Sequence, residues 1–320
     1  MNATIIVPLD RSPLAERVLP RAESLAKQIG ARIVLLSVID VPFEYQAWLE
    51  ATSMVDVKIE AENDYEEYLS KVARDIEGVQ VDTLVRLGSP ETEIRELAHS
   101  LPNAIVIMTS HGRTGFRQWV LGSVTKQIVQ RIRTPVVVVP ASSPDRPESQ
   151  SDTMQRILVP LDGSPFAEHA LDTTLKLFAS TRPEILLLRV IELVNWYGDA
   201  MSVFDYYGLD PYIDAARETA GTYLQDMSLR VQDQGFTVFS EVQIGRVANE
   251  IHAMAERNDV DMIIMATHGR GGVSKLILGS VAEQTLQQST VPLMLIHPEG
   301  SAQESEEVTP TRSTTKAGLV

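Results

Sequence analysis

Apolar residues along this chain fall into two kinds of segment that alternate with each other. Short runs such as Thr4–Leu9 and Ala104–Met108 are almost wholly apolar, as in strands buried on both faces. Other segments carry apolar residues every three or four positions, which predicts amphipathic helices. The first such series is Leu14, Val18, Ala22, Leu25 and Ile29. Strands alternating with helices predict an α/β fold, a parallel sheet covered by helices on both faces.

Local signals place the elements of this fold. Ser12 is expected to cap the first helix, with Pro13 at its first position and Gly30 just past its end. The first half has further strands predicted at Arg32–Val38, about Val79–Arg86, Ala104–Met108 and Val136–Val139, and helices at about Lys58–Ile76, Glu91–Ser100 and Val124–Ile132. The second half has strands predicted near 157–161, 185–190, 236–243, 262–265 and 293–296. We therefore expect five strands in each half.

The two halves are copies of one unit. The run IIVPLDRS at 5–12 returns as ILVPLDGS at 157–164, and SHGRTGFRQWVLGSV at 110–124 returns as THGRGGVSKLILGSV at 267–281. The sequence thus predicts a tandem duplication of an open, doubly wound parallel five-stranded sheet. The expected organisation is domain 1 at 1–140, a polar linker at 141–153, domain 2 at 154–298 and a disordered tail at 299–320.

Composition narrows the classes of function. The chain has 320 residues with a formal net charge of −15, and no block of Lys or Arg suits a nucleic-acid backbone or an anionic membrane. It has no cysteine, which excludes disulfides, thiolate metal sites and cysteine nucleophiles. Its apolar runs are shorter than the roughly 18 residues of a membrane span. A cytoplasmic protein is expected.

Candidate chemistry lies where strands end. In open parallel sheets, ligands bind beyond the carboxyl ends of the strands. Asp10 and Asp162 follow the first strand of each copy, and Gly122-Ser123 and Gly279-Ser280 stand at the start of a helix. A glycine there lets the backbone approach a phosphate, and the helix start offers N–H groups and a positive dipole end. Alternatively, each serine is an ordinary N-cap.

These motifs carry a resemblance to a known family. Its ATP-binding signature is Gly, two residues, Gly, nine residues, then Gly followed by Ser or Thr. The copies fit this spacing from Thr109 and from Ala266, although neither of these two residues is glycine. The chain resembles a tandem universal stress protein, whose domains are Rossmann-like and similar to the adenine nucleotide alpha hydrolases. The resemblance implies binding of ATP or another adenine nucleotide in stress response or signalling.

The resemblance also implies a role for each matching residue. Asp10 and Asp162 would lie near the ribose and phosphates, and the backbones of Val38 and Val190 would read adenine. The phosphate-contacting positions are Gly112, Gly122, Ser123 and Val124 in the first copy, and Gly269, Gly279, Ser280 and Val281 in the second. Arg113 and Arg270 either neutralise phosphate charge or are solvated. In relatives the last strands pair across a two-fold axis, which implies an internal pseudo-dimer through 135–139 and 292–296; a further homodimer stays open.

Departures from the signature favour the second copy. Thr109 and Ala266 stand where the first glycine belongs, and a branched Thr is the larger change. Arg11 occupies the position of Gly163. We therefore expect the second site to bind better than the first. Asp10 and Asp162 are weak candidates for Mg²⁺ ligands, with loop capping as the alternative. His111 and His268 are expected to be structural, because no second ligand stands at metal-binding spacing.

Other functions remain as alternatives. The chain lacks GxxxxGK[ST], a GxGxxG after the first strand and GxSxG. No catalytic residue can be named, so fast catalysis is not supported and slow ATP hydrolysis stays open. An interaction protein that does not bind nucleotide is the other alternative. Aromatic residues after the second strand of each copy either cover a base or pack between domains. They are Phe43, Tyr45, Trp48, Trp196, Tyr197, Phe204, Tyr206 and Tyr207.

Overall fold

The computed structural model describes residues 3–40, 55–110, 121–141, 154–192, 210–269 and 278–297. The expected linker (apart from Ala141), the tail and the aromatic segments after the second strands lie outside these residues. Among the described helices, none is both long and apolar enough to cross a membrane.

Within the described residues, each half contains five strands, as the sequence predicts. The first half comprises β1 (Thr4–Pro8), α1 (Pro13–Glu16), α2 (Leu19–Ile29), β2 (Arg32–Asp40), α4 (Val55–Arg74), β3 (Val81–Gly88), α5 (Pro90–Ser100), β4 (Ala104–Thr109), α6 (Ser123–Arg131) and β5 (Val136–Val139). The second half comprises β6 (Arg156–Pro160), α7 (Pro165–Leu177), β7 (Glu184–Ile191), α9 (Asp210–Asp233), β8 (Val238–Ile244), α10 (Val247–Arg257), β9 (Met262–Ala266), α11 (Ser280–Gln288) and β10 (Leu293–Ile296).

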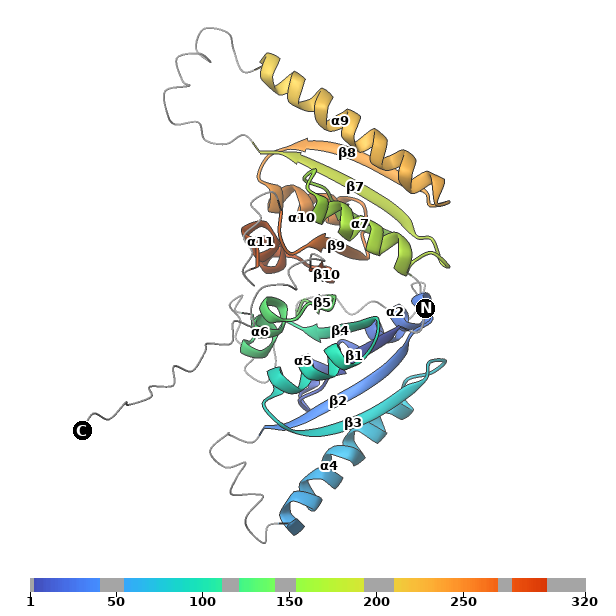
Figure 1. The fold of residues 1–320 in the computed structure, drawn as a ribbon, viewed down its shortest axis with the longest axis vertical. Coiled ribbons are helices and arrows are strands. Elements are labelled where there is room, and N and C mark those ends of the chain that lie inside the picture. Colours follow the sequence, from blue (N-terminus) through green and yellow to red (C-terminus); the bar gives the residue numbers. More distant parts are fainter. Residues whose placement is uncertain are drawn as a thin grey trace, which may run out of the picture.

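The two five-stranded sheets are joined edge to edge into one ten-stranded sheet. Its order is β3-β2-β1-β4-β5-β10-β9-β6-β7-β8, which repeats one parallel arrangement on either side of the centre (Figure 1). At the centre, β5 and β10 are antiparallel, with Val136 opposite Leu295 and Val138 opposite Leu293. The predicted contact between the last strands therefore forms within a single chain. It protects two apolar strand edges that would otherwise be exposed.

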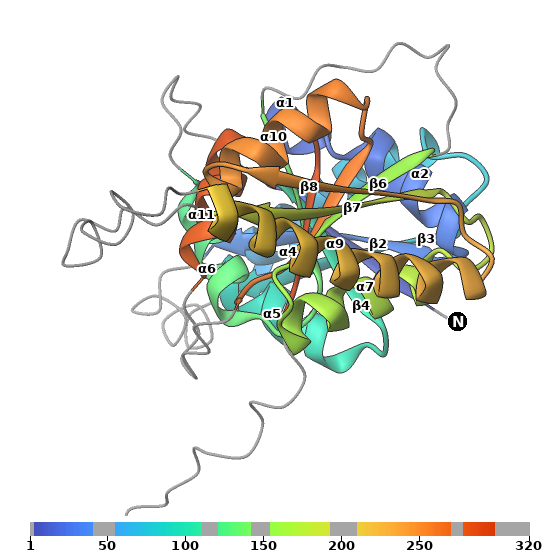
Figure 2. The ribbon, with the colours of Figure 1, turned by 90° about the horizontal axis from the view of Figure 1, so that it is seen from above.

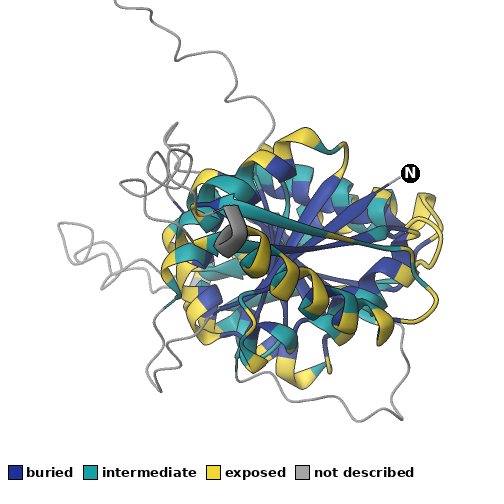
Figure 3. Ribbon diagram, turned by 90° about the horizontal axis from the view of Figure 1, so that it is seen from below, coloured by how far each residue is buried: buried dark blue, intermediate teal, exposed yellow. Residues whose placement is uncertain are grey.

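Helices cover both faces of the sheet (Figure 2). Alternate strand residues point to opposite faces. Ile5 and Val7 join a core with α1, α2 and α4, and this core continues across the centre to α7 and α9. Ile6 joins the other core, which contains residues of α5, α6, α10 and α11. In Figure 3 the central strands are dark and buried, and the outer helix faces are exposed. The edge strands β3 and β8 are mostly half-buried. This double coverage explains why the strands read as continuous apolar runs.

The first predicted helix is interrupted. Ser12 caps it as expected, its hydroxyl accepting the Ala15 N–H at 3.1 Å. The helix then breaks between α1 and α2, so the prediction of one continuous helix from Pro13 to Ile29 is wrong. Pro20 explains the break, because it has no N–H to donate to the carbonyl of Glu16. The second copy has Asp172 at the matching position, and α7 is continuous there.

Polar contacts also connect the halves. The side-chain amide of Gln28, buried in α2, donates to the backbone carbonyl of Met154 at 2.9 Å. The Ser180 hydroxyl donates to the carbonyl of Gln28 at 3.3 Å. These two bonds hold α2 of the first half against the second half, at Met154 before β6 and at Ser180 after α7.

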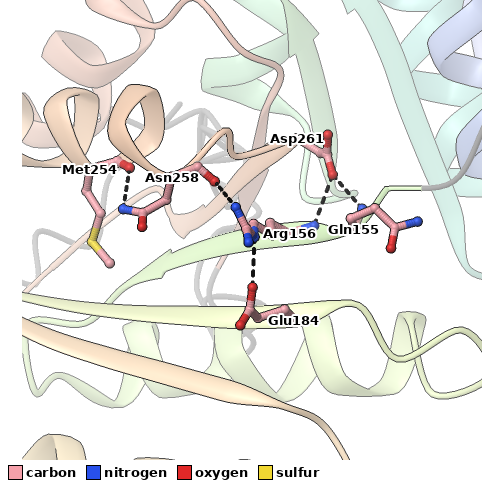
Figure 4. A network of polar contacts seen from close by, with 6 residues as sticks. All are labelled: Gln155, Arg156, Glu184, Met254, Asn258 and Asp261. Carbon is pink, nitrogen blue, oxygen red and sulfur yellow. Dashed lines mark hydrogen bonds and ion pairs between the residues drawn. The ribbon is translucent and has the colours of Figure 1, made fainter. Parts of the chain in front are cut away.

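A polar network fixes the starts of three strands in the second half (Figure 4). The buried Asp261 carboxylate accepts the backbone N–H groups of Gln155 and, at 3.0 Å, Arg156. The Arg156 guanidinium donates to Glu184 at 2.8 Å and to the carbonyl of Asn258 at 2.9 Å. The network therefore ties β6, β7 and β9 together at their amino ends, opposite the carboxyl ends where ligands bind in such folds.

Candidate functional site

A cavity of about 410 Å³ opens at the carboxyl ends of β6, β7 and β9. Its walls come from these strands, from the first turn of α7 and from the starts of α10 and α11. The cavity brings together every predicted site residue of the second copy that the structure describes. They are Asp162, Val190, Ala266, Gly269, Gly279, Ser280 and Val281. Arg270 lies outside the described residues.

The carboxylate of Asp162 is held in place by the turn that follows it. Its Oδ1 accepts the Ser164 N–H at 2.9 Å, and Ser164 in turn caps α7 through a bond from the Ala167 N–H. Its Oδ2 lies against Gly269, 2.5 Å from where a Cβ on that residue would stand. Loop capping and a position in the cavity are therefore compatible, because the two oxygens face different surroundings.

Gly279 and Ser280 form the start of α11. The N-cap is Gly279, and Ser280 is the first helical residue, so the alternative that Ser280 is the N-cap is wrong. The Gly279 N–H donates to the carbonyl of Thr267 at 2.8 Å. A Cβ on Gly279 would lie only 2.9 Å from that same oxygen. This glycine is thus needed for the close approach of two backbone segments, whether or not a ligand is bound.

The first turn of α11 presents backbone N–H groups to the cavity. The first intrahelical bond runs from Glu283 to the carbonyl of Gly279 at 2.9 Å. The N–H groups of Ser280, Val281 and Ala282 therefore have no carbonyl one turn earlier within the helix. All three residues line the cavity. Together with the positive end of the helix dipole, these N–H groups suit an anion.

The opposite part of the cavity is an apolar slot with a backbone edge. Its apolar walls include Leu188, Val190, Val247, Ile251 and Met265. The Leu188 carbonyl accepts the Leu161 N–H, whereas the Ile191 carbonyl accepts the Gly245 N–H on the other side of β7. Because backbone groups alternate in direction along a strand, the N–H and C=O of Val190 point to the β6 side, beyond the last β6 pairing at Pro160. Apolar walls beside one donor and one acceptor suit a flat heterocycle.

Charge in the described lining is sparse. Asp162 and His268 are its titratable side chains. The described residues contain no group of three or more His, Asp or Glu side chains that could hold a metal ion. Any Mg²⁺ at Asp162 would therefore depend on oxygens supplied by a ligand.

The first copy repeats the backbone arrangement. The Gly122 N–H donates to the carbonyl of Ser110 at 2.8 Å, and Gly122 is the N-cap of α6 with Ser123 and Val124 as its first two residues. The alternative that Ser123 is the N-cap is therefore also wrong. Val38 lies on β2 beyond the end of β1, as Val190 does on β7. Gly112, Arg113 and His111 lie outside the described residues.

The carboxylate of Asp10 is also held by the turn that follows it. Its Oδ1 accepts both the N–H and the hydroxyl of Ser12, at 3.0 and 2.6 Å. Thr109 is the buried last residue of β4, and Ala266 has the same place in β9. Because both residues have strand conformation, a positive φ does not explain the glycine of the signature at this position. The remaining difference between glycine and these two residues is the size of the side chain.

Arg11 adopts a conformation that favours glycine. Its φ is 65°, and Gly163 has φ 78° at the matching position. Left-handed backbone strains a long side chain by about 1–2 kcal/mol. The Arg11 guanidinium lies 4.8 Å from the ring centroid of Tyr65 and 6.0 Å from that of Tyr68, which offsets part of this strain. These cation–π contacts direct Arg11 toward α4.

Sequence reasoning missed much of the apolar lining. Leu188 and Met265 were predicted only as strand residues, and Val247 and Ile251 belong to α10, which carried no motif. A usable signal exists for the strand residues, since each stands near the carboxyl end of its strand. The α10 residues follow a strand end by a few positions and are otherwise ordinary helix residues.

Together these features define a class of protein. Two Rossmann-like α/β units in tandem share one sheet, and the second has a cleft at the strand ends that combines a helix start with an apolar slot. The profile described as "Universal stress protein family" matches residues 1–140 and 153–297. The chain therefore belongs to the universal stress protein family, as a tandem member.

Individual relatives agree with this assignment. A universal stress protein of Mycolicibacterium smegmatis is 25% identical over 304 residues, covering 92% of this chain and 97% of the relative. Universal stress protein MJ0577 of Methanocaldococcus jannaschii is 28% identical over 154 residues, covering 44% of this chain and 94% of the relative. The crystal structure of a universal stress protein from Archaeoglobus fulgidus has a TM-score of 0.66 at 24% identity, covering 92% of this chain and 98% of that one. The last comparison supports the fold.

Proposed function

We propose that the cleft of the second half binds an adenine nucleotide, ATP in the first place, and that the bound nucleotide acts as a switch or structural ligand in stress response. The observation that carries this proposal is one cavity holding the first turn of α11, the Asp162 carboxylate and the backbone edge of Val190. Each of the three parts of a nucleotide has a chemically suitable counterpart there.

The proposed pose follows the lining. Phosphate oxygens accept the N–H groups of Ser280 and Val281 and the Ser280 hydroxyl, where the dipole of α11 favours negative charge. The Asp162 carboxylate accepts the ribose hydroxyls. Adenine lies in the apolar slot with its edge on Val190. Because the described lining has one carboxylate and no Lys or Arg, Mg²⁺ accompanies the phosphates in this proposal.

The first cleft is proposed to bind more weakly. Thr109 is larger than Ala266 at the strand end, which reduces the space that remains for a ribose. We expect one nucleotide per chain at concentrations that saturate the second cleft.

Two substitutions at one position test the pose. Ser280→Pro removes the N–H and the hydroxyl at the first helical position, where proline is favoured and where Gly279 with ψ 148° can precede it. Ser280→Ala removes only the hydroxyl. Hydrogen bonds to charged groups contribute about 1.5–3 kcal/mol, so calorimetry with ATP and Mg²⁺ should show affinity lower by about 10- to 150-fold for the proline variant. The alanine variant should lose less.

The duplication supplies the matched control. Ser123→Pro makes the same change in the first copy and should leave the dominant binding event unchanged. Equal losses for both proline variants would contradict the preference for the second cleft. If ATP gave no binding heat at millimolar concentration with the wild-type chain, the nucleotide proposal would fall and an interaction protein of the same fold would be favoured. Phosphate release that survives Ser280→Pro would come from a contaminant.

Organisation and location belong to the same proposal. We place the domain boundaries at 1–140 and 154–298 and the protein in the cytoplasm, where ATP is available. Because β5 and β10 already pair within the chain, we expect a tandem monomer in solution, with a homodimer as the alternative. Limited proteolysis tests the domain boundaries, cell fractionation tests the location, and light scattering tests the oligomeric state.

A further inference from the structure

Two histidine side chains of the second half lie beside the buried hydroxyl of Thr267. Thr267, at the end of β9, is fully buried. Its Oγ1 lies 3.0 Å from Nδ1 of His268 and 3.4 Å from Nδ1 of His297, which follows β10. A hydroxyl has one hydrogen to donate and can accept up to two. The same oxygen lies 3.5 Å from the carbonyl of Ile296, which is a further acceptor for its hydrogen. Thr267 can therefore donate to at most one of the two imidazoles, and at least one Nδ1 must donate its own proton if both contacts are hydrogen bonds.

The outer nitrogens of both rings are unusual. Nε2 of His268 and Nε2 of His297 are buried and have no hydrogen-bond partner within the described part of the chain. A buried imidazole nitrogen without a partner is tolerated more readily as a bare acceptor than as a charged donor. Burial of this nitrogen without a partner favours the neutral form of His297.

Most of the groups around His297 lower its pKa. Burial, foremost, and then neighbouring His268 lower the pKa of His297 to about 4. The Arg133 guanidinium lowers it further, and the backbone of Val129 in α6 acts in the opposite direction. Asp162, the carboxylate beside the pair, lies against Gly269 next to His268. The pair thus sits between the second cleft and a helix of the first half.

The pair is also directly connected to the phosphate end of the cleft. Thr267 and His268 line the cavity. The Thr267 carbonyl accepts the Gly279 N–H, and the Cβ position of Gly279 is 3.7 Å from Cα of His268. An anion held by the first turn of α11 would therefore lie close to His268, which contacts Thr267 and through it His297. Negative charge at that distance stabilises a proton on an imidazole.

The first half lacks this arrangement. Ser110 stands at the position of Thr267, and its hydroxyl accepts the Ala141 N–H at 3.1 Å. Pro140 stands at the position of His297. A titratable pair is therefore a property of the second cleft and not of the repeated fold.

We propose that His268, Thr267 and His297 form a proton relay beneath the second cleft, and that binding of a phosphate-bearing anion at the start of α11 places one additional proton on this relay. This inference rests on the proposed function of the same cleft. Nucleotide binding to the second cleft then strengthens as the pH falls below neutrality toward about 4, the pKa of His297 in the ligand-free chain. The relay makes the site sensitive to acidification.

Calorimetry measures the linked proton directly. ATP with Mg²⁺ is titrated into the full chain at about pH 6 in two buffers of different ionisation enthalpy. ATP takes up protons of its own, so the result is the difference between the wild-type chain and its variants. Wild type should take up about half a proton more than His268→Gln or His297→Gln. His99→Gln, an exposed histidine of the first half, should match wild type. Equal uptake by all four chains would overturn the relay.

Nuclear magnetic resonance separates this inference from nucleotide binding. In the ligand-free chain, the imidazole signals of His268 and His297, assigned from the variants, should shift together with pH, and that of His297 should titrate near pH 4. Thr267→Val keeps both rings and should make their titrations independent. Independent titration of the two rings near pH 6.5 in the wild-type chain would refute the relay even if ATP binds. Coupled titration without any ATP binding would preserve the relay and refute the nucleotide.

Discussion

The Asp162 carboxylate and the α-carbon of Gly269 are packed so closely that no side chain fits between them. Oδ2 of Asp162 lies 2.5 Å from the position a Cβ on Gly269 would take. Oδ1 is bound to the Ser164 N–H at 2.9 Å, so the carboxylate cannot turn away without losing this hydrogen bond. A glycine of the repeated motif thus sets the position of an acidic residue more than 100 positions earlier in the chain.

Gly269→Ala should therefore displace Asp162. We expect ATP affinity to fall by about tenfold, equivalent to about 1.4 kcal/mol, as measured by calorimetry. In an Asp162→Ala background the added methyl group meets no carboxylate, and Gly269→Ala should then have little further effect. Additive losses in the double variant would show that Gly269 acts independently of Asp162.

Gly279 should be needed for stability as well as for binding. Gly279→Ala brings a methyl group within 2.9 Å of the Thr267 carbonyl, and backbone atoms must move to relieve it. We expect the free energy of unfolding to fall by about 1–3 kcal/mol in urea denaturation. Gly221→Ala is the control, since it lies inside α9 with nothing within 4 Å of its Cβ position. It should stabilise the chain by about 0.5–1 kcal/mol. Unchanged stability of Gly279→Ala would contradict the packing argument.

The fold was predictable because its pattern is redundant. Continuous apolar strands, helices with a 3.6-residue period and the repeat itself all indicate the same doubly wound unit. The break at Pro20 was predictable in principle, since a proline inside a helical pattern removes a backbone donor. Joining of the two sheets through β5 and β10 was expected from the resemblance, whereas Gln28 on the buried side of α2 gave no indication that it would bind Met154.

The site was predictable only where backbone motifs mark it. Gly279 and Ser280 indicate a helix start, and Asp162 follows a strand end. The topology therefore predicts that these three residues line one cavity. The packing of Asp162 on Gly269 and the grouping of His268 with His297 depend on side-chain geometry across residues far apart in sequence. Sequence spacing carries no information about such contacts, and His297 was not a candidate at all.

Asp261 lies at the amino ends of the strands, opposite the cleft, and should contribute strongly to stability. Asp261→Ala leaves the N–H groups of Gln155 and Arg156 without their acceptor (Figure 4). A buried donor without an acceptor is unfavourable by about 1–3 kcal/mol, so we expect a loss of about 2–4 kcal/mol in urea denaturation. Asp261→Asn keeps an acceptor oxygen and should lose less. The folded Asp261→Ala protein should bind ATP normally. Weakened binding would argue against separate roles for the amino and carboxyl ends of the strands.

The pH dependence of stability should reveal the buried state of His297. Its pKa is lowered from the ordinary 6.5 to about 4, chiefly by burial, so the unfolded chain binds this proton more readily than the folded chain. Stability from this group is therefore complete above about pH 6.5 and is lost as the pH falls toward 4. The shift corresponds to at most about 3 kcal/mol.

Urea denaturation of the wild-type chain and of His297→Gln at several pH values between about 7 and 4 measures this contribution. Any difference in stability between the two chains at neutral pH is a constant offset. Below about pH 6.5 the wild type should lose stability faster, because glutamine cannot take up a proton. His99→Gln removes an exposed histidine and should parallel the wild type. Parallel curves for His297→Gln and wild type would mean that burial does not lower the pKa of His297 in the folded chain.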